Sequence, residues 1–222
     1  MNRLRNTLTG TAALKTDFNA SSLHTGKILI TAKDINFSYN NNDALWKESL
    51  SFQLKSGDRL CIKGVNGSGK TTLLKLITGE IVPTQGSLSR IDFKYVYLNQ
   101  EYSILKNDKS VLEQAETFNG RNLPEHEIKT ILNRYLFPAT VWDKSCRKLS
   151  GGEKMRLAFC CLMISDNTPD MFILDEPTNN LDIQSIEIIT ATIKNYTGTV
   201  VVVSHDKYFV NEIGIENFHT FV

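Results

Sequence analysis

The residues whose types and spacing most clearly indicate chemistry form the segment Gly64-Val65-Asn66-Gly67-Ser68-Gly69-Lys70-Thr71. The segment fits the phosphate-binding pattern GxxxxGK[ST], set between an apolar strand and a helical run. Its glycines allow backbone N–H groups to wrap around a phosphate at the positive end of a helix. Lys70 adds a full charge, worth about 4 kcal/mol per phosphate charge at about 4 Å, against about 0.3–1 kcal/mol for a helix dipole.

This loop predicts a nucleotide-binding site in which Lys70 dominates the electrostatics and the backbone supplies the geometry. We expect the Thr71 hydroxyl to bind Mg²⁺. The nucleotide-binding residues expected from the loop and the start of its helix are Gly64, Asn66, Gly67, Ser68, Gly69, Lys70, Thr71 and Thr72.

Two acidic residues, Asp175 and Glu176, follow the apolar run Met171 to Leu174. Neighbours on an extended strand face opposite ways, so we expect the two carboxylates to have different tasks. Asp175 suits the Mg²⁺ shell, and Glu176 is placed to accept a proton from an attacking water. His205 follows the predicted buried strand Thr199 to Val203. Ligands of such sheets bind at the carboxyl ends of the strands, so His205 is predicted to contact a γ-phosphate.

A third element, Ser150-Gly151-Gly152, precedes a helical pattern that runs from Glu153 to Ile164. A serine and two glycines at a helix start form either an ordinary N-cap or a second anion-binding helix end. The chain thus has two candidate phosphate-binding helix ends.

The elements that must position these residues alternate between strands and helices, which predicts an α/β fold with parallel strands. Alternating polarity predicts half-buried antiparallel strands at Ile28 to Ile35 and Leu50 to Leu54. Short apolar runs predict buried strands at Arg59 to Lys63, Met171 to Leu174 and Thr199 to Val203. Helices are expected at residues 71–78, 110–118, 124–135, 153–164, 183–195 and 207–213.

Composition is that of an ordinary globular protein: 222 residues, 41% hydrophobic, with 25 Lys and Arg against 24 Asp and Glu. The longest apolar run, Leu157 to Ile164, has eight residues against the roughly 18 of a membrane span, which excludes a membrane-embedded chain. A net charge of +1 argues against a dedicated nucleic-acid binder, so such a partner would have to meet a local patch. Four cysteines without CxxC spacing are expected to be buried thiols in a reducing compartment.

Taken together, the ordered motifs GVNGSGKTT, LSGGE, FILDEPTNNLD and VVSHD resemble the nucleotide-binding domain of the ATP-binding cassette (ABC) family, over residues 28–222. The resemblance implies a P-loop NTPase fold, with a RecA-like core, an antiparallel β subdomain and an α-helical signature subdomain at about residues 101–165. It implies that ATP and Mg²⁺ are bound between the phosphate loop of one cassette (residues 64–71) and the signature helix of a second. The signature is the motif LSGGE at residues 149–153, and the signature helix is the one that begins there.

Further residue roles come from the same resemblance. Ser150, Gly151 and Gly152 would touch the γ-phosphate across a dimer interface, and Asp182 would lie in the loop that reaches across it. Gln100 matches the residue that senses Mg²⁺ and the attacking water, and Tyr39 matches the aromatic that stacks on adenine, although a tyrosine at a strand end can simply pack. Glu176 matches the general base, His205 the switch histidine, and Lys70 and Thr71 the phosphate and Mg²⁺ ligands. The chain is therefore predicted to be an active ATPase.

The segment Glu176-Pro177-Thr178-Asn179-Asn180-Leu181-Asp182, with Glu153 in the signature, looks most like the C-terminal cassette of an ABC-F protein. That group has two cassettes joined by a helical linker and acts in the cytoplasm on the ribosome, in translation or antibiotic resistance. Asn180 departs from it, because the group usually has His there. Residues 1–27, with a charge of +3, would be the end of such a linker or an added lead-in.

The hypothesis is therefore an ATP-gated ribosome-binding module, paired with a second cassette as a homodimer or in tandem and contacting the ribosome through a linker outside this chain. The alternative is the ATP-binding subunit of a membrane transporter. A repair or condensin-type ATPase fits less well, because such proteins interrupt the cassette with a long coiled coil and only a short segment separates Gln100 from Leu149.

Overall fold

The structure, a computed structural model, describes residues 23–40, 43–99, 103–215 and 217–221. Its first layer is an antiparallel sheet of strands β1 (Ile28–Asn36), β2 (Leu50–Lys55) and β4 (Gln85–Arg90), in the order β2-β1-β4. The antiparallel pairing predicted from the alternation in β1 and β2 is confirmed. Strand β4 was not predicted, because its sequence QGSLSR is polar and mostly exposed, and it is held by pairing with β1.

The second sheet is parallel and contains β3 (Arg59–Gly64), β5 (Tyr95–Leu98), β6 (Met171–Asp175), β7 (Thr199–Val203) and β8 (Asn217–Phe221). Its order is β5-β6-β7-β3-β8, so the strands that precede the phosphate loop, the acidic pair and His205 lie together in the sheet. The predicted parallel strands β3, β6 and β7 are confirmed, whereas β5 and β8 were not predicted, although β5 (YVYL) consists of residues that favour strands.

Helices occur where the sequence predicts them, with boundaries set by their caps: α1 (Lys70–Thr78), α2 (Val111–Thr117), α3 (Glu125–Arg134), α4 (Gly151–Ile164), α5 (Ile183–Asn195) and α6 (Lys207–Glu212). Two 3₁₀ turns, η1 (Ala139–Val141) and η2 (Cys146–Lys148), precede α4. Helix α4 begins two residues earlier than predicted, because Ser150 is its N-cap. None of the helices in the described ranges is long and apolar enough to cross a membrane.

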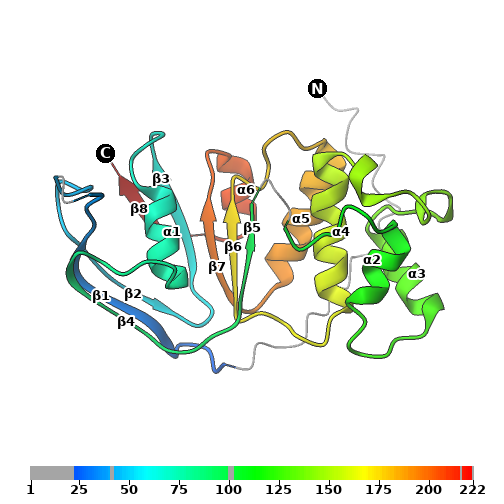
Figure 1. Cartoon of the computed structure of the whole chain (residues 1–222), viewed down its shortest axis with the longest axis horizontal. Coiled ribbons are helices and arrows are strands. Elements are labelled where there is room, and N and C mark those ends of the chain that lie inside the picture. Colours follow the sequence, from blue (N-terminus) through cyan, green and yellow to red (C-terminus); the bar gives the residue numbers. More distant parts are fainter. Residues whose placement is uncertain (1–22, 41–42, 100–102, 216, 222) are drawn as a thin grey trace.

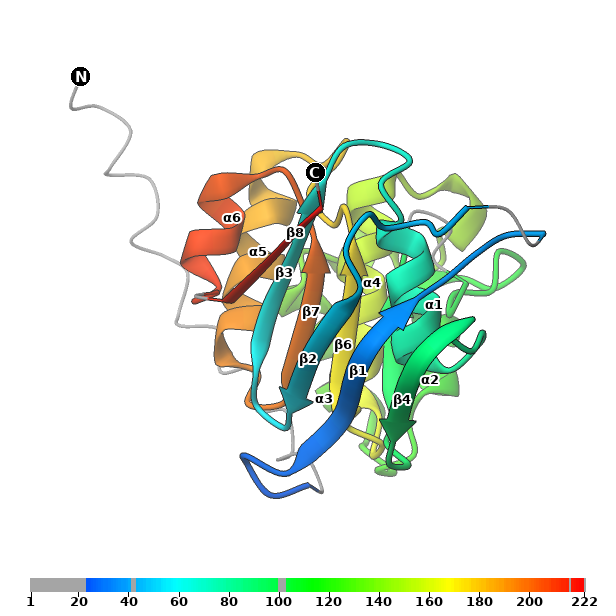
Figure 2. The ribbon, with the colours of Figure 1, turned by 90° about the vertical axis from the view of Figure 1, so that its left-hand side faces the viewer.

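Hydrophobic cores lie on both faces of the parallel sheet. On one face, Met171 and Ile173 of β6 share a core with α1 and the antiparallel sheet. On the other face, Phe172 and Leu174 share a core with α4, α5 and α6. Figures 1 and 2 show the resulting layers, with α1 between the two sheets and with α2 and α3 beyond α4. Alternate residues of one buried strand therefore hold the phosphate-loop helix and the signature helix on opposite sides of the sheet.

The four cysteines, Cys61, Cys146, Cys160 and Cys161, are buried free thiols, as predicted. Cys160 and Cys161 are neighbours on α4, which is buried continuously from Met155 to Ile164. A helix that is covered on all sides is an internal element, which explains why adjacent cysteines can both be buried.

Candidate functional site

The phosphate loop connects β3 to α1, and two of its glycines adopt left-handed conformations, Gly67 with φ 84° and Gly69 with φ 94°. Gly69 is also a close-packing position, because a Cβ there would lie 2.5 Å from Trp46 Nε1. Trp46 is nearly buried and donates through Nε1 to the Ser68 carbonyl oxygen at 3.1 Å. The backbone curvature of the loop thus depends on glycine and on a tryptophan packed beneath it.

Two polar side chains of the loop, those of Lys70 and Ser68, are suited to a phosphate. Lys70 Nζ donates to the carbonyl oxygens of Gly64 at 2.8 Å and Val65 at 2.9 Å, so the ammonium group is held over the loop. Ser68 Oγ is buried without a hydrogen-bond partner among the described residues. A buried hydroxyl in that situation is costly unless it donates to a ligand, and the Lys70 ammonium group of the same loop suits an anion. These residues therefore fit a phosphate group.

Tyr39 lies just beyond β1 at the same loop. Its hydroxyl is 2.8 Å from the hydroxyl of Thr72 on α1, and its ring packs edge-on against Phe37. The residue is 51% exposed. Because about half of the residue is exposed, part of the ring surface is accessible to a planar ligand.

Asp175 ends β6 and is held from the neighbouring strand. Tyr97 of β5 donates its hydroxyl to Asp175 Oδ2 at 2.9 Å. Burial, and then the Asp175 carboxylate, raise the pKa of Tyr97 well above its usual value, so its hydroxyl remains a donor. The parallel register, with Tyr97 beside Ile173 and Leu98 beside Leu174, brings the two side chains together. The sequence did not single out Tyr97, although its place on a strand just before Gln100 was the available signal.

The expectation that Asp175 and Glu176 face opposite ways is wrong. Strand β6 ends at Asp175, and Glu176 turns out of it with φ 49°. The turn is fixed by the Glu176 N–H, which donates to the Val203 carbonyl oxygen at 2.8 Å. A left-handed conformation in a non-glycine residue costs about 1 kcal/mol or more and tends to occur at functional sites. Both carboxylates consequently line the same cleft.

His205 stands beside the second carboxylate. Its Nε2 is 3.5 Å from Glu176 Oε1, which is beyond good hydrogen-bond distance. The imidazole is 64% exposed, whereas the Glu176 side chain is 17% exposed. The histidine is therefore adjacent to the acidic pair and accessible to a ligand.

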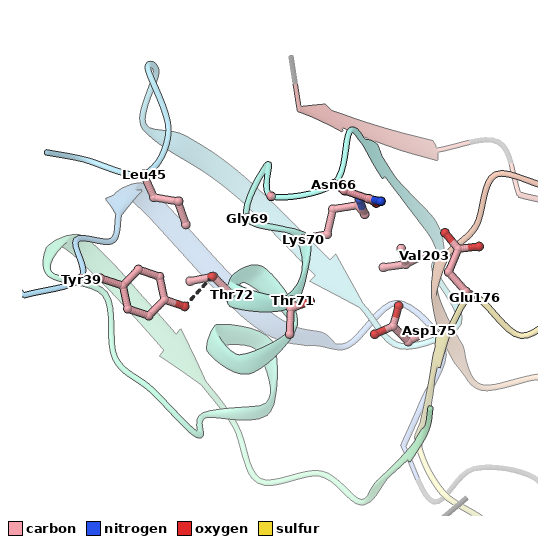
Figure 3. Close-up of a pocket in the computed structure, with 11 residues that line it drawn as sticks. Tyr39, Leu45, Asn66, Gly69, Lys70, Thr71, Thr72, Asp175, Glu176 and Val203 are labelled. Atoms are coloured by element: carbon pink, nitrogen blue, oxygen red, sulfur yellow. Dashed lines mark hydrogen bonds between the residues drawn. The ribbon is translucent and has the colours of Figure 1, made fainter. Parts of the chain in front are cut away.

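These elements surround a cleft of about 330 Å³, shown in Figure 3. In that view Tyr39 and Leu45 lie on one side, Asp175 and Glu176 on the other, and the phosphate loop between them. The cleft is lined by Tyr39, Leu45, Asn66, Gly67, Gly69, Lys70, Thr71, Thr72, Asp175, Glu176 and Val203. Leu45 and Val203, which the sequence did not indicate, supply apolar walls. Gln100 lies outside the described residues.

Ser150, Gly151, Gly152 and Asp182 are not among the residues that line this cleft. They meet instead at the start of α4, where a Cβ on Gly152 would lie 2.7 Å from Ser185 Oγ and 2.9 Å from Asp182 Oδ2. Asp182 is the N-cap of α5 and accepts from both the amide and the hydroxyl of Ser185. These hydrogen bonds, together with Arg156, hold the pKa of Asp182 below its usual range. The start of α4 and the start of α5 thus form one tightly packed unit.

Arg156 of α4 belongs to the same unit, and the sequence did not single it out. Its side chain is nearly buried, donates to the Tyr135 carbonyl oxygen at 3.1 Å and lies over the Phe137 ring. Because a buried guanidinium must find partners, Arg156 ties α4 to the turn after α3.

The model of the family described as ABC transporter matches residues 47–179, which is more than half of the chain. The chain belongs to the ABC transporter family. The matched part includes the phosphate loop, the signature and the acidic pair, so the resemblance seen in the sequence is confirmed for this cassette.

Curated relatives include ABC-F proteins. ABC transporter F family member 5 of Arabidopsis thaliana is 39% identical over 191 residues, 85% of this chain and 27% of the relative. YdiF of Bacillus subtilis is 40% identical over 85% of the chain and 29% of the relative. The ATP-binding protein Uup of Haemophilus influenzae is 32% identical over 96% of the chain and 33% of the relative. The cassette thus spans about a third of the length of these relatives, and its likeness to the ABC-F group is confirmed.

Solved structures support the fold. The ATP-binding cassette MJ0796, described as a dimer in a post-hydrolysis state bound to ADP and phosphate, matches with a TM-score of 0.66 and 22% identity, over 87% of this chain and 94% of that one. A bacterial Atm1-family ABC exporter with ATP bound matches with a TM-score of 0.70 and 20% identity, over 92% of this chain and 39% of that one. The predicted ABC fold, with its parallel core and antiparallel sheet, is therefore confirmed.

Proposed function

We propose that this cassette binds ATP with Mg²⁺ and hydrolyses it to ADP and phosphate. The observation that carries the proposal is the convergence of Lys70, Thr71, Asp175 and Glu176 on one cleft, from two segments that are distant in the sequence. A cation beside the loop N–H groups suits the β- and γ-phosphates, and two carboxylates at the opposite wall suit a metal and a water.

The proposed Mg²⁺ ligands are the Thr71 hydroxyl and the Asp175 carboxylate, with Gln100 as a third by resemblance. Hydroxyl and carboxylate oxygens are the hard ligands that Mg²⁺ prefers, and both residues line the cleft. When bound, the ion would neutralise charge on the phosphates. The chain's own contribution is to hold Asp175 in place through Tyr97.

Glu176 is the proposed general base. Its carboxylate is largely buried at the cleft wall. Its left-handed backbone conformation turns the residue toward the cleft. It would accept a proton from the water that attacks the γ-phosphate. His205, beside Glu176 and exposed, is positioned to donate to that phosphate, and the exposed face of Tyr39 is proposed to stack on adenine.

A second cassette is the proposed partner, either another copy or a tandem domain. The signature residues Ser150, Gly151 and Gly152 stand apart from the cleft, on a helix packed against the opposite face of the sheet. A helix start of this kind suits a γ-phosphate bound by a different chain. The dimeric state of the solved cassette MJ0796 supports this arrangement, and Asp182 is proposed to lie at the same interface.

At the biological level we propose a cytoplasmic ABC-F role, in which ATP closes two cassettes into a clamp on the ribosome and hydrolysis releases it. The support is the set of ABC-F relatives, of which this chain spans about a third. In this view residues 28–222 are the C-terminal cassette, with a helical subdomain at about residues 101–165, and residues 1–27 are the end of the linker.

Sedimentation separates this role from that of a transporter subunit. The Glu176→Gln variant, loaded with ATP to hold the closed state, is mixed with a cell extract and separated into ribosomal and membrane fractions. The ABC-F role predicts that the full-length protein with this substitution is recovered with ribosomes when ATP is present. Recovery with membranes alone would favour the transporter role instead, because there the same closure acts on a membrane-spanning partner.

A further inference from the structure

The start of α4 carries a negative charge at the place where the proposed function requires a phosphate. Glu153 is the third residue of the helix, and its Oε2 accepts from the Ser150 amide at 2.7 Å. The Ser150 hydroxyl accepts in turn from the Glu153 amide at 3.2 Å, which completes a capping box. The carboxylate is therefore folded back onto the helix end, beside the residues proposed to meet a γ-phosphate.

Lys144 neutralises this carboxylate. Its Nζ is 2.9 Å from Glu153 Oε1 and 3.1 Å from Oε2, so one ammonium group contacts both oxygens. The pair is partly covered, with 31% of the lysine side chain and 25% of the glutamate side chain exposed. Burial raises the pKa of Glu153, but the Ser150 amide and Lys144 outweigh it and hold the pKa below its usual range. The carboxylate thus remains charged and paired.

The backbone of Lys144 is also held by hydrogen bonds. Its carbonyl oxygen accepts from the Val111 amide at 3.1 Å, at the first residue of α2, and its amide donates to the Val141 carbonyl oxygen at 3.0 Å. These backbone bonds fix where the side chain of Lys144 begins, and the two contacts with Glu153 hold its ammonium group at the far end. The pair therefore connects the start of α2 with the start of α4.

The charges at the helix end then decide whether a phosphate can approach. A helix start attracts an anion through its N–H groups and dipole, but a full negative charge in the first turn opposes that attraction. An ammonium group within 3.1 Å of both carboxylate oxygens cancels most of the opposing charge. A glutamine at this position would need no such partner, because its amide is neutral while still able to accept from Ser150.

We propose that Lys144 is a positioning residue that allows the acidic signature to accept the phosphate of ATP bound by a partner cassette. This inference rests on the proposed pairing of two cassettes around ATP. It assigns Lys144 no contact with the nucleotide. Its effect is exerted through Glu153, so the consequence of losing the lysine should disappear when the carboxylate is also removed.

The test measures ATP-driven pairing of the full 222-residue chain by sedimentation velocity, in the Glu176→Gln background that slows hydrolysis. Lys144→Met is expected to weaken pairing about tenfold, because the helix end then carries an uncompensated carboxylate. Adding Glu153→Gln to Lys144→Met should restore pairing to within about twofold of the parent. Lys194→Met is the matched control, since Lys194 forms an exposed ion pair with Glu212 at the end of α5 away from Asp182.

The outcomes separate this inference from the proposed function. If the parent pairs with ATP and Lys144→Met pairs equally well, the inference is overturned and the proposed function stands. If Lys144→Met weakens pairing but Glu153→Gln does not rescue it, Lys144 acts through the fold rather than through charge, and the inference is again overturned. If the parent itself does not pair at any concentration of ATP, pairing of two copies is ruled out and this inference is overturned with it, whereas the proposed ATP hydrolysis is tested separately by phosphate release.

Discussion

The two helix ends proposed to meet phosphate, at the start of α1 and at the start of α4, are built in different ways. Helix α1 follows Gly69, which provides no side-chain cap, and has no acidic residue in its first turn. Helix α4 follows Ser150 and closes a capping box with Glu153. The first end leaves its N–H groups to a ligand and adds Lys70, whereas the second satisfies part of its own hydrogen-bonding need.

This difference favours a division of tasks. The α1 end, with its own cation and two carboxylates nearby, is suited to hold a nucleotide by itself. The α4 end, with its hydrogen bonds partly satisfied and its acid paired with Lys144, is suited to contact a phosphate that another chain already holds. Substitutions at the two ends should therefore affect different steps.

The largest expected effect is on turnover at the α1 end. Glu176→Gln should lower the rate of ATP hydrolysis by about 10²–10⁴-fold while ATP still binds, because the proposed base is lost and the shape of the cleft is kept. Steady-state phosphate release and binding of a fluorescent ATP analogue measure the two quantities. The control is Glu187→Gln on an exposed position of α5, which makes the same chemical change away from the cleft. An unaltered rate for Glu176→Gln would exclude it as the base.

The next largest effect is on affinity. Lys70→Met should weaken ATP binding by about a hundredfold to a thousandfold, because a full charge beside the phosphates is removed. Lys154→Met makes the same change in the first turn of α4 and should leave the affinity of the single cassette for ATP unchanged. Equilibrium titration at a low protein concentration measures both. Equal losses of ATP affinity in Lys70→Met and Lys154→Met would contradict the division of tasks between the two helix ends.

A third prediction concerns stability of the loop. Gly69→Ala should lower the free energy of unfolding by about 2–4 kcal/mol, because the new Cβ would overlap Trp46 in a left-handed backbone. Gly67→Ala has a similar backbone but nothing within 4 Å of the added Cβ, so its cost should be about 1 kcal/mol. Urea unfolding measures the free energy of unfolding of both variants. If the two substitutions lowered it equally, packing against Trp46 would not be what fixes the loop.

The smallest expected effect is at the proposed metal ligand. Tyr97→Phe removes the hydroxyl that holds Asp175 and should raise the Mg²⁺ concentration needed for half-maximal ATP binding by about tenfold. Tyr95→Phe, on the same face of β5, is the control. Nucleotide binding at a series of Mg²⁺ concentrations is the measurement. A Tyr97→Phe curve that overlies the control would show that the hydroxyl does not position the ligand.

Much of this molecule could be predicted from its sequence, because local patterns determine the elements that carry the motifs. The helix Ile183–Asn195 and the strand Thr199–Val203 have the boundaries expected from periodicity and apolar runs. Strands β4 and β8 escaped prediction, since polar or mixed residues form them only by pairing with β1 and β3. Propensity gives no signal for β4, whose sequence is QGSLSR, and only a weak one for the short β8.

Within the site, the sequence predicts the residues of the phosphate loop and the acidic pair, but not the residues that hold them in position. Tyr97, Trp46 and Arg156 act through contacts with segments distant in the sequence. Glu176 was expected to continue the strand, and its left-handed turn depends on the Val203 carbonyl of a neighbouring strand. Such tertiary contacts are not encoded in any local pattern.

The central claim is that the phosphate loop of one chain works with the signature of another. Mixing two inactive variants tests it directly. Lys70→Ala lacks the phosphate-loop charge but keeps its signature, and Gly151→Asp places a new carboxylate at the signature but keeps its loop. Neither should hydrolyse ATP alone. An equal mixture should recover about a quarter of the parental rate, since half of the pairs are mixed and each has one complete site. A mixture that stays inactive while the parent is active would contradict the claim.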